Sequence, residues 1–126
     1  MYGTLNSIKL SGTSMAAAVV SGTVALMIED ARATFGSAPT PNALKAMLQA
    51  SALPLSDASG AADDPLVQGA GGLNTAGAVA LAHALNPTVA LNSNWLVTGI
   101  TKSTTVDSQQ IVWGDHIVWG DVFLQP

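Results

Sequence analysis

The sequence predicts a mainly helical fold with short β-strands near both ends of the chain. Three segments carry helical patterns bounded by start or stop signals, around residues 14–35, 40–53 and 74–85. Loose alternation occupies residues 1–10, and β-branched residues interrupted by polar pairs follow Pro87. Apolar residues at helical spacing favour helices, whereas alternation and β-branched runs favour strands.

The first helical segment runs from Ser14 to about Phe35. Alanine, valine, leucine and methionine lie on nearly every face of it. A helix that is apolar all round is normally buried, so we expect this helix to lie in the core. Its last turn, residues 29–32, is charged and should reach solvent, and Gly36 is a natural stop.

The second helical segment has a clear start signal. Thr40 suits the N-cap and Pro41 suits the first helical position. Leu44, Met47 and Leu48 then form one apolar stripe, which predicts an amphipathic, half-exposed helix.

The third helical segment follows a stretch rich in Asp, Ser, Gly and Ala, residues 54–72, which is predicted to be a loop. The helix should begin near Asn74 or Thr75 and end at Leu85, because Asn86-Pro87 cannot continue it.

The change of composition after Pro87 predicts a helical part, residues 1–87, and a short β tail, residues 88–126. The tail holds a repeat, IVWGD from Ile111 and again from Ile117, whose Gly-Asp pair suits a hairpin turn.

The composition of the chain limits which classes of binding partner are expected. The chain has 126 residues, of which 48% are hydrophobic and only 10% charged. So few charges suggest a chain that packs against another protein or forms a homo-oligomer. The net charge of −4 and the lack of a basic patch argue against nucleic acid. The absence of cysteine excludes disulfides and most zinc sites. The longest apolar run, residues 15–28, is shorter than the ~18 residues that a membrane span needs, so no membrane is expected.

One serine stands where a nucleophile could work. Ser14 follows Gly12-Thr13 at the start of the first helix. Free backbone N–H groups and the helix dipole favour negative charge at such a point, including an oxyanion formed during acyl transfer. The simpler interpretation is that Thr13 or Ser14 is only an N-cap residue.

The segment SGTSMAAAVVSGTVAL resembles the active-site serine segment of the subtilisin-like serine proteases, the subtilases. The later segments TPNALKAMLQASALPL and QGAGGLNTAGAVALA resemble the helices and glycine-rich turn that follow in that family. The resemblance covers residues 2–85. It implies an extracellular serine hydrolase of α/β descent, in which helices cover a parallel sheet and Ser14 is the nucleophile.

The sequence also departs from the family. Ala18 and Val19 stand where subtilases usually have proline followed by histidine or valine. The family's catalytic aspartate, catalytic histidine and oxyanion asparagine precede the serine, yet residues 1–13 hold neither Asp nor His. The chain therefore looks like the final third of a subtilase, and self-association is the expected way to cover its apolar helix.

Two histidines could act as the base that a serine nucleophile needs. His116 lies beside Asp115 between the two IVWGD units, and we predict it as the base; His83 on the third helix is the weaker candidate. With an incomplete triad, hydrolysis of a small ester is expected before efficient cleavage of a peptide. The alternative is a catalytically incomplete fragment that serves as an interaction or assembly module.

The remaining patterns predict no cofactor and no metal. Asp57, Asp63 and Asp64 share one loop, but their spacing lacks the order of a calcium-binding loop. Residues 68–72 are rich in glycine and are predicted to form a close backbone turn rather than a phosphate site. Three tryptophans could form a binding face, although stacking within a small sheet is the ordinary explanation. They are Trp95, Trp113 and Trp119.

Overall fold

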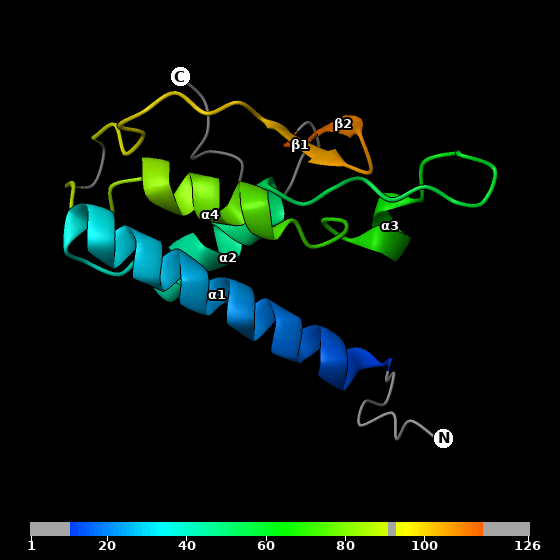
Figure 1. Cartoon of the computed structure of the whole chain (residues 1–126), viewed down its shortest axis with the longest axis horizontal. Coiled ribbons are helices and arrows are strands. Elements are labelled where there is room, and N and C mark those ends of the chain that lie inside the picture. Colours follow the sequence, from blue (N-terminus) through cyan, green and yellow to red (C-terminus); the bar gives the residue numbers. More distant parts are fainter. Residues whose placement is uncertain (1–10, 91–92, 115–126) are drawn as a thin grey trace, which may run out of the picture.

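The computed structural model describes residues 11–90 and 93–114. Within them lie four helices and a two-stranded antiparallel sheet. The predicted mainly helical fold with short strands is confirmed there (Figure 1). The short strands predicted within residues 1–10 lie outside the described residues. The helices are α1 (Thr13–Phe35), α2 (Pro41–Ala50), α3 (Pro65–Gln68) and α4 (Thr75–Ala84), and the strands are β1 (Ser103–Val106) and β2 (Gln109–Val112).

The ends of the long helices follow from local sequence. Thr40 is the N-cap of α2, and its hydroxyl accepts a hydrogen bond from the backbone N–H of Ala43 at 3.2 Å. Asn74 caps α4 in the same way through the N–H of Gly77. Gly36 ends α1 in the left-handed conformation, with a φ of 72°. These boundaries agree with the start and stop signals in the sequence.

One described element differs from the sequence prediction. The short helix α3 lies within residues 54–72, which were predicted to be a loop throughout. The described hairpin turns at Asp107-Ser108, where both residues have positive φ, and the predicted hairpin at the Gly-Asp of the repeat is not tested. Asp115 and the second IVWGD unit lie outside the described residues.

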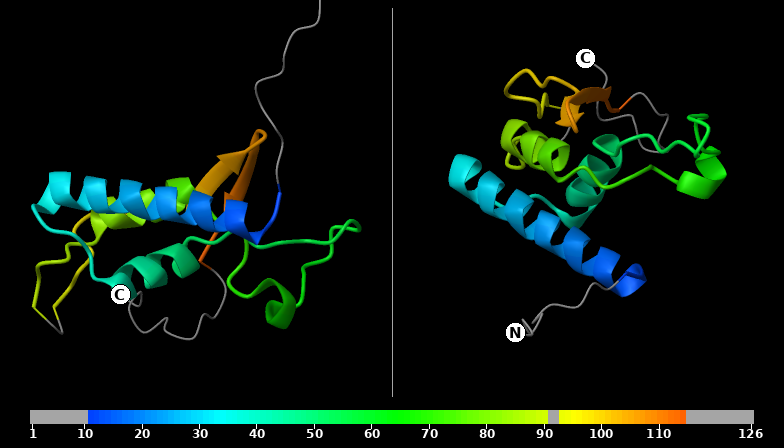
Figure 2. Two further views of the ribbon diagram at one scale, coloured as in Figure 1. Left: turned by 90° about the horizontal axis from the view of Figure 1, so that it is seen from below. Right: turned by 45° about the vertical axis from the view of Figure 1, so that its right-hand side comes forward.

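The core forms where α1, α2 and α4 meet. Helix α4 packs against α1, α2 and β1. Figure 2 shows α1 running past the rest of the molecule, with its N-terminal end projecting beyond α4. The residues that build the core are Met27, Leu44, Met47, Ala50, Ala78, Leu81, Ala82 and Trp113.

The hairpin is tied to this core by one buried polar group. The amide of Asn74, only 4% exposed, donates to the Ser51 carbonyl at 2.9 Å and to the Thr104 hydroxyl at 3.0 Å. The indole Nε1 of Trp113 donates to the same hydroxyl at 3.0 Å. Buried polar groups need such partners, so this network fixes where β1 and β2 sit on the helices.

Helix α1 is not the buried helix that its composition predicted. Only Thr23, Met27 and Ala31 are buried in it. Every residue from 11 to 22 is exposed, which includes large apolar side chains such as Val19, 58% exposed. The prediction was wrong because apolar composition says that a helix needs cover, and α4 is long enough to cover only the C-terminal half of α1. We call residues 13–22 the uncovered half of α1 and residues 23–35 the packed half.

Candidate active site

Ser14 lies in the first turn of α1, at the free end of the uncovered half. Gly12 is the N-cap residue, and no side chain caps this helix. The interpretation of Thr13 or Ser14 as a capping side chain is therefore wrong. The Gly12 carbonyl accepts from the N–H groups of Met15 and Ala16, both at 3.1 Å.

The backbone around Ser14 has the donors that an oxyanion needs. The first N–H groups of an α-helix have no partner within the helix. Among the described residues, none accepts a hydrogen bond from the N–H of Thr13 or Ser14. The φ of 148° at Gly12 lies in a region that favours glycine, so the sharp turn into the helix depends on this residue. Ser14 thus combines an exposed hydroxyl with free donors at the positive end of a long helix.

His83 does not lie near Ser14. Its imidazole Nδ1 lies 3.2 Å from Oδ2 of Asp30, which is on the packed half of α1. Asp30 follows Ser14 by sixteen residues, which is about 24 Å along a helix that rises ~1.5 Å per residue. A base must reach its nucleophile within hydrogen-bond distance, so His83 cannot serve Ser14 of the same chain.

His116, the predicted base, lies outside the described residues. His83 is the histidine that residues 11–90 and 93–114 contain, and within those ranges no imidazole lies beside Ser14. The described part of the chain therefore places the Ser14 hydroxyl beside free backbone donors, with no histidine next to them.

The pairing of His83 with an acidic residue is the feature that sequence reasoning missed. The Nδ1 of His83 also lies 3.3 Å from the hydroxyl of Thr34, so Asp30 and Thr34 both face it from α1. Their spacing of four residues places them on one helix face, which was readable from the sequence. Which residue of α4 they meet depends on the packing of the two helices, and no local pattern shows that.

The acidic loop uses its carboxylates to order its own backbone. Asp57 accepts from the hydroxyl and N–H of Ser59, at 2.6 and 2.8 Å, and from the N–H of Ala61 at 3.0 Å. The hydroxyl of Ser59 first, and then these backbone donors, lower the pKa of Asp57 below its ordinary value. Asp64 accepts from the N–H of Leu66 at 2.8 Å. In the described part of the chain, no three potential metal ligands come together.

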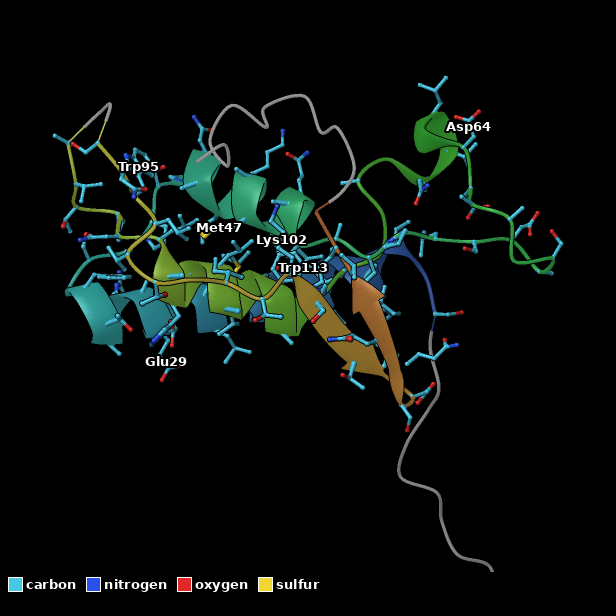
Figure 3. The ribbon with its side chains drawn as sticks, turned by 90° about the horizontal axis from the view of Figure 1, so that it is seen from above. Glu29, Met47, Asp64, Trp95, Lys102 and Trp113 are labelled. Atoms are coloured by element: carbon cyan, nitrogen blue, oxygen red, sulfur yellow. The ribbon has the colours of Figure 1, made fainter. Side chains whose placement is uncertain are left out.

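Trp113 is a core residue and not part of an exposed binding face. It is 2% exposed and belongs to the same buried core cluster as Met47; Figure 3 labels both residues. Its role is structural, but it belongs to the helical core, so the prediction of stacking within a small sheet is wrong for this residue. Trp95 is half-buried, and Trp119 lies outside the described residues.

The glycine-rich segment forms the close backbone turn that was predicted. Gly72 and Leu53 exchange backbone hydrogen bonds at 2.8 and 2.9 Å. A Cβ atom at Gly71 would collide with the carbonyl oxygen of Leu53, and the φ of Gly71 is 113°. Only glycine satisfies both constraints.

Comparison with known proteins places the chain in a family. The model of the subtilase family, peptidase family S8, matches residues 3–85 and therefore spans α1, α2, α3 and α4. No match was found in the search of curated proteins or in the search of solved structures. The matched region is well over half of the 126 residues and includes Ser14 with its helix. The chain therefore belongs to the subtilase family.

Proposed function

We propose that this chain is a serine hydrolase of subtilase descent in which Ser14 is the nucleophile. The observation that carries the proposal is the position of Ser14 in the first turn of a long helix, exposed and beside free backbone donors, within the region that matches the family. Attack of the hydroxyl on an ester or amide carbonyl would place the oxyanion near the N–H groups of Thr13 and Ser14.

Within residues 11–90 and 93–114, no histidine lies beside Ser14, so the general base must come from elsewhere. His116 is our candidate, donated by the same chain or by a second copy, with Asp115 or Asp121 as the carboxylate that orients it. A serine without an efficient base reacts with activated esters much more readily than with peptides. We therefore propose small esters as the first substrates.

The experiment is intact-mass analysis after treatment with a fluorophosphonate, which reacts with activated serines. We expect one adduct, located at Ser14 and absent from Ser14→Ala. Ser21→Ala is the matched control, because Ser21 is an exposed serine on the same uncovered half whose hydroxyl donates to the Ala17 carbonyl at 2.9 Å.

Two results of this experiment decide the assignment. Loss of the adduct in His116→Ala, with the helical content unchanged, would support His116 as the base. Absence of an adduct on folded wild-type protein would contradict the proposal, as would an adduct that persists in Ser14→Ala.

The second candidate function is that of an assembly module, and the uncovered half of α1 favours it. Met15, Val19 and Val20 are all at least 36% exposed there, and no residue from 10 to 28 is charged. Two such faces can meet without repulsion between like charges, and Gly22 has no neighbouring atoms that would prevent a close approach. We propose a second copy of the chain as the partner.

Length and composition also allow α1 to cross a membrane. It has 23 residues. Its 18-residue apolar stretch has a mean hydropathy of 1.3, and 17% of that stretch is buried. The family match explains this helix without a lipid, because the match includes all of α1, whose first turn carries the serine motif. The proposal that neither a membrane nor nucleic acid is a partner rests on this family match and on the net charge of −4.

A further inference from the structure

The packed half of α1 carries a second constellation of reactive groups, remote from Ser14. His83 on α4 faces Asp30 on α1, with Nδ1 lying 3.2 Å from Oδ2 and 3.4 Å from Oδ1 of the carboxylate. The hydroxyl of Thr34 lies 3.3 Å from the same ring nitrogen. Because both carboxylate oxygens lie near Nδ1, the proton of a neutral imidazole is favoured on that nitrogen.

This arrangement leaves the other ring nitrogen available. None of the described residues makes a hydrogen bond to Nε2 of His83, and the side chain is 59% exposed. A carboxylate at Nδ1 and a lone pair at an accessible Nε2 are the features of an oriented general base. Asp30, whose side chain is 29% exposed, fixes the tautomer and stabilises the imidazolium that forms when Nε2 takes a proton.

A groove lies beside this pair. It has a volume of about 530 Å³, and both Asp30 and His83 line it. Its other lining residues are mainly small or apolar, and two hydroxyl groups come from the segment that connects α4 to β1. They include Val79, Ala80, Ile100, Thr98 and Thr101. Such a groove suits a small, largely apolar molecule with one polar group.

The geometry points to a second hydrolytic centre in this chain, in which the His83–Asp30 pair acts as general base on water toward small apolar esters bound in the groove. Nε2 accepts a proton as the water oxygen forms a bond to the ester carbonyl carbon. The tetrahedral intermediate then collapses, its bond to the leaving oxygen breaks, and the imidazolium gives that oxygen the proton. No other reactant is needed, and the centre does not depend on Ser14.

The test is the rate of hydrolysis of 4-nitrophenyl acetate by the full chain and its variants. We expect His83→Gln to lower the rate about tenfold and Asp30→Asn to lower it about threefold. These effects are smaller than the roughly 10²–10⁴-fold typical of a positioned general acid or base, because this pair is partly exposed. Glu29→Gln is the matched control: it removes a carboxylate next to Asp30 from an exposed position, and should leave the rate unchanged.

Ser14→Ala separates this centre from the proposed serine nucleophile. The rate that depends on His83 should persist in Ser14→Ala and in wild-type protein already labelled by a fluorophosphonate. Circular dichroism and thermal unfolding establish that each variant is folded. An unchanged rate in folded His83→Gln, or complete loss of hydrolysis in Ser14→Ala, would overturn the inference, whereas the fluorophosphonate result at Ser14 decides the proposed function separately.

Discussion

The two halves of α1 have similar composition and different surroundings. Residues 15–20 and 24–28 are both dominated by alanine, valine, leucine, isoleucine and methionine. In the packed half, Met27 and Ala31 are completely buried, and Met27 belongs to the core cluster with residues of α2 and α4. In the uncovered half, Met15 is 41% and Val19 is 58% exposed, and Ser14 lies in the first turn. Apolar composition therefore indicates that a helix needs a partner, and the length of its neighbours decides which part finds one.

The largest contrast between the halves is expected from two methionines. Met27→Ala removes a side chain that is 0% exposed, and it should lower the free energy of unfolding by about 2–5 kcal/mol, because it leaves a cavity between α1 and the core. Met15→Ala should change the free energy of unfolding by less than ~0.5 kcal/mol. Urea unfolding followed by circular dichroism measures both. Similar losses in the two variants would contradict the division of the helix.

A smaller effect is expected where the halves meet. Thr23 is 2% exposed, and its hydroxyl lies 3.1 Å from the Val19 carbonyl and 2.8 Å from the Thr75 hydroxyl on α4. Thr23→Val keeps the shape and leaves the Thr75 hydroxyl without this partner, so the loss should be about 1–2 kcal/mol. The control is Ser21→Ala, which removes a similar hydroxyl from the uncovered half. It should change the free energy of unfolding by less than ~0.5 kcal/mol. Thermal unfolding of the two variants provides the comparison.

Val19→Lys tests what covers the uncovered half. The folded single chain should keep its free energy of unfolding within ~0.5 kcal/mol, because this side chain already faces solvent. A charge on a face that otherwise has none should weaken the proposed self-association. Sedimentation velocity over a range of concentrations measures this, with Lys45→Arg on α2 as a control that keeps the charge. Equal association of Val19→Lys and wild type would exclude this face as the interface.

The loop after α2 supplies the smallest expected effect. The donors from Ser59 and Ala61 lower the pKa of Asp57, so the ionised carboxylate is favoured in the folded loop. Its contribution is complete above pH about 4, the ordinary range of an aspartate, and is lost as the pH falls through the lowered pKa. The protection of the Ser59 and Ala61 amides, measured relative to their intrinsic exchange rates, should fall in that acid range, and Asp57→Asn should abolish this acid-induced loss of protection. An unchanged dependence in the variant would assign it to another group.

Much of the fold could be predicted because its signals are local. The capping of α2 by Thr40 and Pro41, the Asn74 cap of α4 and the Gly36 stop of α1 each follow from the chemistry of one or two residues. The turn at Asp107-Ser108 carried a weaker signal, since both residues adopt positive φ without being glycine.

The candidate site was less predictable because its parts are far apart in the sequence. The position of Ser14 at the start of a helix was readable from GTSMA alone. The contact between Asp30 and His83 joins residues 53 positions apart, and it depends on how α4 packs along α1. The exposure of Val19 depends equally on the lengths of neighbouring elements, which are properties of the whole fold.

Hydrogen–deuterium exchange along α1, at a concentration at which the chain is monomeric, tests the central claim most directly. The amides of residues 17–22 should exchange at least about tenfold faster than those of residues 24–34, because packing protects only the second group. Equal protection along the whole helix of the monomer would contradict the division into a packed half and an uncovered half that presents Ser14.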